Sequence, residues 1–230
     1  MLATKMRLAA GKALDPSDVE SLFAWFRGDS INQSNGTTIQ TWSDKSGNNR
    51  HFNQSNTNWR PTFRTSMLNG MPGVEFNGHD NRMHTDSWTN QNQPNTVFVV
   101  YYNINVDATP YDGLSDNTGR TSGYFWNEKW YMFAGSDFFF DIGKASGYTG
   151  IITSVYNGSN SIIYENGEEK ATGNAGTNSC DGFTIGSRWD GEYPLNGGIL
   201  EYIYCNDALS SKERRGIERY LCKRYGITLQ

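Results

Sequence analysis

Acidic side chains that alternate along one strand would indicate glycan cleavage, and this sequence has no such strand. Retaining glycosidases need two carboxyl groups about 5–5.5 Å apart, and residues i and i+2 or i+4 of a strand share a face. Residues 15–20 (DPSDVE) are acidic but begin with the Asp-Pro of a turn. Glu165 and Glu168 flank a predicted hairpin tip, and Glu201 stands alone in its segment. We therefore expect no catalytic carboxylate pair and predict that the protein is not an enzyme.

Other catalytic motifs are missing as well. None of the three histidines lies near a G-x-S-x-G sequence, and no glycine-rich phosphate loop precedes a helix. Cys180, Cys205 and Cys222 show no C-x-x-C or metal-type spacing, and an odd number of cysteines is a poor disulfide framework. We expect these three residues to be buried free thiols.

Calcium is the one metal for which the sequence offers candidate ligands. It needs several oxygen ligands, and Asn77, Asp80 and Asn81 would converge with Asp44 if their two loops met. Asn and Asp also hold turns through hydrogen bonds to their own backbone, and the set has few carboxylates. We favour the turn interpretation and predict no metal or cofactor.

Tryptophans in polar, loop-like sequence indicate glycan binding. An aromatic ring stacks on the apolar face of a sugar while amides and carboxylates bind its hydroxyls. Trp25 and Trp42 fit core positions by alternation, and we expect at least half of the tryptophans to be structural. Trp189 is the one we expect to be exposed, because residues 186–191 read as a loop. The candidate glycan-binding residues are Trp189, Arg188, Asp190, Trp126, Trp130 and Trp88.

Composition limits the class of protein. The 230 residues suffice for one large domain, and 14% aromatic residues exclude a disordered chain. A net charge of −4 argues against nucleic-acid binding. No apolar run is long enough to span a bilayer, and the apolar stretch after Arg7 is too short for a signal peptide. We expect synthesis in the cytoplasm without membrane association.

Strand-like runs with Asn-Gly turns between them determine the predicted fold class. Asn-Gly between alternating apolar runs is a strong hairpin signal, and many short strands with only terminal helices favour an antiparallel sandwich. The protein is therefore predicted to be all-β. The predicted strands cover residues 22–27, 39–42, 73–76, 96–104, 123–126, 130–133, 138–142, 151–156, 161–165, 183–186 and 197–204.

The end of the chain predicts a single amphipathic helix over residues 210–225. Ser210 and Glu213 have the spacing of a capping box, and Gly226 suits a left-handed C-cap. An apolar stripe would pack on the sheet, and we interpret the many basic residues as the solvated face. The stripe consists of Ile217, Leu221 and Tyr225.

Several ordered motifs resemble a known family. The pattern G-x-I-x-E-x-I-x-Y describes residues 197–204, and L-S-x-x-E-R-x-x-I-E-x-Y-L describes residues 209–221. The pattern K-x-Y-G-I describes residues 223–227, and W-x-D-x-S-G-N matches residues 39–49 (IQTWSDKSGNN). These segments resemble the laminin-G-like jelly-roll domains of the concanavalin A-like lectin/glucanase superfamily. The resemblance implies a concanavalin A-like antiparallel β-sandwich with a short N-terminal arm and one C-terminal α-helix. We divide the chain into an arm, residues 1–20, and the sandwich, residues 21–230.

The first ten residues, MLATKMRLAA, resemble the openings of phage virion proteins that carry laminin-G-like domains. The resemblance implies a non-enzymatic virion structural protein, a capsid decoration or tail-surface component, that contacts other virion subunits and host-surface polysaccharide and forms a homo-oligomer. The alternatives are a free carbohydrate-binding lectin domain and, last, a glycoside hydrolase. The residues expected to dock on a virion subunit are Met1, Leu2, Lys5, Met6, Arg7 and Leu8.

Overall fold

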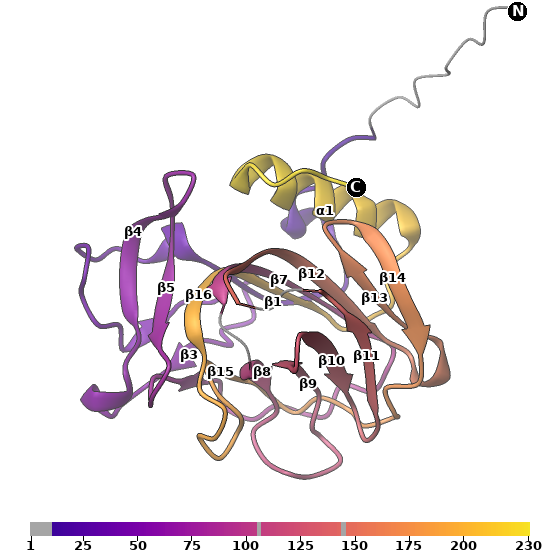
Figure 1. Ribbon diagram of the computed structural model, residues 1–230, viewed down its shortest axis with the longest axis horizontal. Coiled ribbons are helices and arrows are strands. Elements are labelled where there is room, and N and C mark those ends of the chain that lie inside the picture. Colours follow the sequence, from indigo (N-terminus) through magenta and orange to yellow (C-terminus); the bar gives the residue numbers. More distant parts are fainter. Residues whose placement is uncertain (1–10, 105–106, 144–145) are drawn as a thin grey trace, which may run out of the picture.

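The computed structural model describes residues 11–104, 107–143 and 146–230, so the predicted docking residues 1–8 lie outside the described part. In that part, two antiparallel sheets of eight strands each face one another as a sandwich, as predicted (Figure 1). Sheet A has the order β14 (Glu168–Gly173), β13 (Ser161–Glu165), β12 (Tyr148–Tyr156), β7 (Asn95–Ile104), β16 (Asn196–Cys205), β5 (Met71–Asn77), β4 (Thr62–Leu68), and β1 (Leu22–Arg27) also pairs with β16. Sheet B has the order β11 (Asp137–Asp141), β10 (Lys129–Phe133), β9 (Ser122–Trp126), β8 (Ala108–Asp112), β15 (Thr184–Ile185), β6 (Met83–His84), β3 (Phe52–Asn53), β2 (Thr41–Trp42).

Strand β16 is buried on both faces, which explains its nearly continuous apolar sequence. Successive side chains of a strand point to opposite faces. Tyr202 and Tyr204 therefore pack into the core between the two sheets, whereas Ile203 and Cys205 pack into a second cluster on the outer face of sheet A. Trp42 belongs to the first cluster and Trp25 to the second, so both predicted core tryptophans are buried.

Helix α1 (Ser211–Tyr225) covers the outer face of sheet A (Figure 1). Ser210 and Glu213 form the predicted capping box, and Gly226 has the predicted left-handed conformation with φ of 65°. The apolar stripe of Ile217, Leu221 and Tyr225 is at most 1% exposed. The tip of the β4–β5 hairpin secures the end of the helix, because Asn69 Nδ2 donates to the Tyr225 carbonyl at 2.6 Å.

The prediction that the basic residues of this helix are solvated is wrong for Arg214. Its Nη1 donates to both carboxylate oxygens of Glu218, at 2.6 and 2.7 Å, and its guanidinium lies 3.6 Å from the ring centroid of Tyr164. Glu218 is fully buried and also accepts from Thr153. A long side chain with a charged end can be buried when a partner neutralises it.

Most predicted strands are confirmed, but several were missed. Strands β3 and β6 are two residues long, too short for an alternation pattern, and the predicted strand 39–42 is reduced to Thr41–Trp42. Strand β8 was missed because it contains Pro110, and a proline within a segment argues against a strand. Strand β4 was also missed. Short 3-10 turns complete the fold: η1 (Pro16–Asp18), η2 (Gly28–Ser30), η3 (Thr57–Trp59) and η4 (Gly158–Asn160).

The described part of the N-terminal arm lies against helix α1. The Leu14 amide donates to the Gly216 carbonyl at 3.0 Å, and a Cβ atom on Gly216 would lie 2.7 Å from the Leu14 Cβ. Asp15 then caps the predicted helical turn η1. The chain thus contacts helix α1 before it enters the sandwich, and Leu14 packs against the apolar cluster between the helix and sheet A. Within the described ranges no helix has the length and apolar character that crossing a membrane requires.

Candidate functional site

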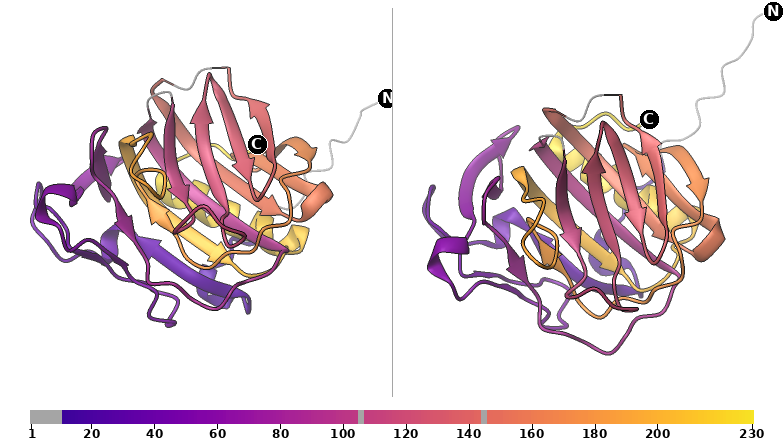
Figure 2. Two further views of the ribbon diagram at one scale, coloured as in Figure 1. Left: turned by 90° about the horizontal axis from the view of Figure 1, so that it is seen from below. Right: turned by 60° about the horizontal axis from the view of Figure 1, so that its bottom comes forward.

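The outer face of sheet B carries exposed aromatic rings. Along β9, β10 and β11, alternate residues point inward, so Phe125 and Trp130 are buried in the core. The residues between them point outward, and Trp126 and Phe139 are each 43% exposed. Figure 2 shows these strands in front and helix α1 behind them, on the far side of the sandwich. The two outer faces of the molecule therefore differ: helix α1 covers sheet A, and aromatic side chains of sheet B face outward.

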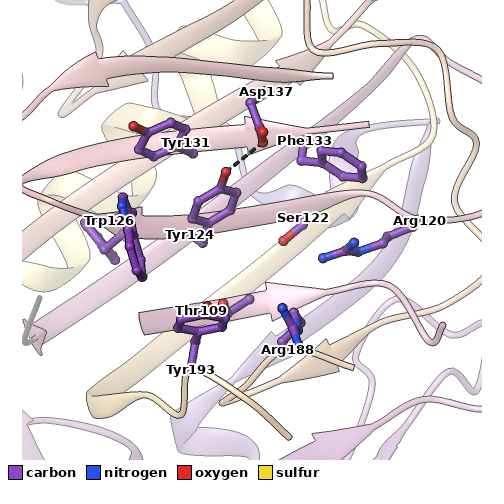
Figure 3. A pocket seen from close by; sticks show the side chains of 11 residues that line it. Thr109, Arg120, Ser122, Tyr124, Trp126, Tyr131, Phe133, Asp137, Arg188 and Tyr193 are labelled. Carbon is purple, nitrogen blue, oxygen red and sulfur yellow. Dashed lines mark hydrogen bonds between the residues drawn. The ribbon is translucent and has the colours of Figure 1, made fainter. Parts of the chain in front are cut away.

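A pocket of about 440 Å³ lies on this face, between β8–β11 and the loop that precedes β16 (Figure 3). The rings of Tyr124 and Tyr131 are stacked, with centroids 4.8 Å apart. Trp126 meets Tyr193 edge to face at 5.5 Å, so strand and loop together form one wall. The volume falls within the ~300–1,000 Å³ typical of small-molecule sites. The lining residues are Thr109, Arg120, Ser122, Tyr124, Phe125, Trp126, Tyr131, Phe133, Asp137, Arg188 and Tyr193.

The loop of residues 188–193 is held in place by charged and backbone hydrogen bonds. Arg188 pairs with Asp190, its Nε donating at 2.8 Å, and the Gly191 amide donates to the Arg188 carbonyl at 2.9 Å. The hydrogen bond from Arg188 lowers the pKa of Asp190, so this carboxyl stays ionised. The Thr109 amide of β8 donates to the Tyr193 carbonyl at 2.9 Å. These contacts fix the position of the Tyr193 ring beside Trp126.

An ion pair with a buried carboxylate lies beside the pocket. Arg120 donates to both oxygens of Asp112, at 2.8 and 3.1 Å, and its Nη1 donates to Asp116 at 3.0 Å. The Trp189 amide also donates to Asp112, at 3.2 Å, which ties the 188–193 loop to this pair. Burial raises the pKa of Asp112, and Arg120 opposes that shift. The pair positions Arg120, whose guanidinium lies 4.8 Å from the Phe133 ring centroid.

The pocket can bind a polar ligand with apolar faces. Its aromatic side chains offer rings, and the hydroxyl of Thr109 and the guanidinium of Arg188 offer hydrogen bonds. Among the described residues, Asp137 is the one carboxylate in the lining, and it accepts from the Tyr124 hydroxyl at 2.6 Å. Burial and the hydrogen bond to Asp137 raise the pKa of Tyr124, which stays a donor. The lining of the pocket thus offers one carboxylate, whereas hydrolysis by a carboxylate pair needs two.

Two of the predicted glycan-binding residues, Trp126 and Arg188, line this pocket. Asp190 forms a salt bridge with Arg188. Trp189 belongs to the same loop and is 37% exposed, but it does not line the pocket. The other two tryptophans lie elsewhere. Trp130 is fully buried against Tyr101 and Tyr111, so a glycan cannot reach it, and the prediction for this residue is wrong.

Trp88 is half-buried at the other end of sheet B, away from the pocket. Its indole N–H donates to the Cys180 carbonyl at 3.0 Å, and its ring packs against Phe183 and Tyr204. Cys180, Cys205 and Cys222 are buried free thiols, as predicted.

Sequence reasoning missed Tyr124, Tyr131, Phe133 and Asp137. The signal was present, because the alternation that places Trp130 and Met132 in the core also directs Tyr131 and Phe133 outward. Tyr193 carried no such signal, since its backbone is left-handed, with φ of 50°, in an irregular loop.

The residues considered for calcium form turns. Asn77 Oδ1 accepts from the amides of His79, Asp80 and Asn81, at 3.0 to 3.3 Å. Both oxygens of Asp44 accept from its own loop, including the amides of Ser46 and Arg50. Across the described ranges, no group of three or more His, Cys, Asp and Glu side chains is arranged to hold a metal ion.

Comparisons with known proteins support the fold. No family model matches the sequence, and no curated protein matches it. Among solved structures, domain 4 of AbnA, a GH43 extracellular arabinanase from Geobacillus stearothermophilus in complex with arabinotriose, is similar with a TM-score of 0.62 and 16% identity. The match covers 86% of this chain and 98% of that domain. The β-sandwich predicted from sequence is thereby shown.

Two further structures are similar over most of this chain. The receptor binding domain of botulinum neurotoxin D has a TM-score of 0.62 and 14% identity, and the match covers 91% of this chain and 55% of that one. A Trypanosoma rangeli sialidase has a TM-score of 0.57 and 15% identity, and the match covers 90% of this chain but 33% of the sialidase. At these identities the similarity shows a shared fold and does not transfer an activity.

Proposed function

We propose that the protein is a non-enzymatic glycan-binding module whose site is the aromatic pocket on the outer face of sheet B. The observation that carries this proposal is the cluster of Trp126, Tyr193 and Tyr124 around a 440 Å³ pocket that also offers arginine and hydroxyl groups. Pyranose rings present C–H faces to aromatic rings and hydroxyls to polar groups. The similar arabinanase domain was solved with arabinotriose, which supports the same class of ligand for this chain.

The pocket is suited to an uncharged stretch of glycan. Arg120 is already neutralised by Asp112 and Asp116, and Arg188 by Asp190. These guanidinium groups act as fixed hydrogen-bond donors and as partners of aromatic rings, with Arg188 5.1 Å from the Tyr193 centroid. A charged sugar would gain little from an arginine that is already paired.

A glycan array followed by calorimetry tests this proposal. We expect a saturable hit on neutral polysaccharide fragments that Trp126→Ala weakens at least tenfold, because the substitution removes one wall of the pocket. Trp59→Ala is a matched control, since Trp59 is 36% exposed but lies outside the pocket. An array without any hit, or a hit that Trp126→Ala leaves unchanged, would contradict the proposal.

We further propose that a phage particle displays this module, as a capsid decoration or tail-surface protein. The support is the virion-like sequence of residues 1–10 together with the position of the arm. Leu14 lies on helix α1, which covers sheet A, whereas the pocket lies on the opposite sheet. Attachment through the arm to a neighbouring subunit would therefore leave the pocket facing outward, toward host-surface polysaccharide.

Deletion of residues 1–14 tests the display proposal. The truncated protein should retain its β-type circular dichroism and its glycan binding but should no longer be incorporated into particles. Glycan binding and incorporation into particles are measured separately, so a result that contradicts the display proposal does not affect the binding proposal. Unchanged incorporation would contradict docking through the arm.

A further inference from the structure

A second pocket, of about 190 Å³, lies at the other end of sheet B. The loop that follows β2 forms one side of it, with Arg50 and His51, and the loop that follows β6 forms the other, with Asp86 and Trp88. None of its lining residues also lines the aromatic pocket. Its smaller volume suits one monosaccharide-sized group rather than a length of chain.

Arg50 has an unusual environment in this pocket. Its guanidinium lies 3.8 Å from the ring centroid of Phe23 and 5.0 Å from that of Trp88. Its Nε is buried, and within the described ranges it has no hydrogen-bond partner. Burial lowers the pKa of Arg50, and the negative charge of Asp44, with which it forms no salt bridge, opposes that shift. Arg188 differs, because its hydrogen bond to Asp190 raises its pKa.

The loop that carries Arg50 is held rigidly by Asp44. One carboxylate oxygen of Asp44 accepts from the amides of Trp25 and Ser46, at 2.9 and 2.8 Å, and the other accepts from the Arg50 amide at 3.0 Å. The Asp44 amide in turn donates to His51 Nδ1 at 3.0 Å. A neutral His51 must then carry its proton on Nε2, which makes it a hydrogen-bond donor. The site is therefore preorganised before any ligand binds.

We propose that this pocket binds the carboxylate of an acidic sugar, a uronic acid, with Arg50 as the anchoring residue. A planar guanidinium that is partly removed from water and has no ion-pair partner among the described residues fits a carboxylate through two parallel N–H···O bonds. His51 Nε2–H supplies a further donor. The amide of Asn49, the hydroxyl of Ser87 and the exposed carboxylate of Asp86 bind sugar hydroxyls, and Asp86 would disfavour a ligand of higher negative charge.

Calorimetric and NMR titration with sodium glucuronate tests the inference. We expect saturable binding in the millimolar range that Arg50→Gln weakens at least tenfold. Arg82→Gln is a matched control, because Arg82 also stacks on an indole, 4.0 Å from the Trp59 centroid, without lining this pocket. In the unmodified protein, the indole N–H signal of Trp88 should shift during the titration while that of Trp126 does not. This second measurement holds even if Arg50→Gln disturbs the loop.

Two further ligands, glucose and acetate, test separately the carboxylate of glucuronate and its ring with the hydroxyls. Glucose should bind at least tenfold more weakly than glucuronate, because it lacks the carboxylate. Acetate should also bind at least tenfold more weakly, because it lacks the ring and hydroxyls. Glucose as tight as glucuronate, acetate as tight as glucuronate, or no saturation with glucuronate would each overturn the inference. Because Trp126→Ala should leave glucuronate binding unchanged, failure here is distinguishable from failure of the neutral-glycan site.

Discussion

The two outer faces of this sandwich both carry large apolar side chains, but these are buried on one face and exposed on the other. Helix α1 covers the outer face of sheet A, where Leu200 and Ile203 are fully buried. The outer face of sheet B at β9–β11 leaves Trp126 and Phe139 nearly half exposed. Apolar area stabilises a fold only when it leaves water. The covered face therefore contributes stability, and the open face leaves apolar area exposed where the proposed ligand would bind.

The two faces also bury carboxyl groups with different partners. Glu201 lies beneath the helix, where it accepts from Trp25 Nε1 and from the Tyr225 hydroxyl, both at 2.7 Å. Burial raises its pKa to about 7, although these two hydrogen bonds oppose the shift. On the open face, the buried carboxylate of Asp112 is paired with Arg120, and Asp190 is paired with Arg188 in the 188–193 loop. Substitutions on the two faces should therefore separate stability from binding.

The largest effect is expected from Leu221→Ala in the covered face. Leu221 is fully buried between helix α1 and sheet A, and buried Leu→Ala substitutions cost about 2–5 kcal/mol. Urea unfolding measures this loss. Lys223→Ala, at an exposed position of the same helix, should change stability by less than about 0.5 kcal/mol. A loss below about 1 kcal/mol for Leu221→Ala would mean that the helix is not firmly packed.

A second prediction concerns the dependence of stability on pH. Because the folded pKa of Glu201 is about 7 and its ordinary value is 4.5, the folded protein holds a proton that the unfolded chain has released between those values. The contribution of Glu201 is therefore fully present below pH about 4.5 and is lost as the pH rises to about 7. The loss is on the order of 3 kcal/mol.

Glu201→Gln removes this titration. Its free energy of unfolding relative to the unmodified protein should rise between pH 4.5 and 8, measured by urea unfolding at several pH values. A constant difference for Glu201→Gln would place the carboxyl of Glu201 in contact with water.

On the open face, Trp126→Ala should act on binding alone. Loss of one stacking ring should weaken glycan binding at least tenfold, about 1.4 kcal/mol. The free energy of unfolding should change by less than about 0.5 kcal/mol, because the ring is 43% exposed. Calorimetry and urea unfolding on the same preparation measure the two effects. A large loss of stability would show that the open face also supports the fold.

The smallest effect is expected where the arm crosses helix α1. Gly216→Ala should favour the helix by up to about 1 kcal/mol, but the new Cβ would lie 2.7 Å from the Leu14 Cβ and displace the arm. We expect a net change within about 1 kcal/mol and faster tryptic cleavage after Lys12. Lys212→Ala, on the same helix, serves as a control. Unchanged cleavage with a full gain in stability would contradict packing of the arm.

Local patterns sufficed to predict most of the strands and the terminal helix. The capping box at Ser210 and the C-cap at Gly226 are confirmed because each depends on a few neighbouring residues. The tryptophan assignments were less complete. Trp126 and Trp130 are four residues apart in similar polar sequence, yet one is exposed and the other is buried, because a tight turn at residues 127–128 reverses the chain between them.

The sequence by itself determined the all-β class, the position of the helix and the absence of an alternating acidic strand, since these depend on periodicity and nearest neighbours. Only the tertiary structure decided which face of each sheet is covered. It also brought Tyr193 to Trp126, and Arg50 between Phe23 and Trp88. These contacts join segments far apart in the chain, and the sheet order that unites them arises from long-range strand pairing that no local pattern specifies.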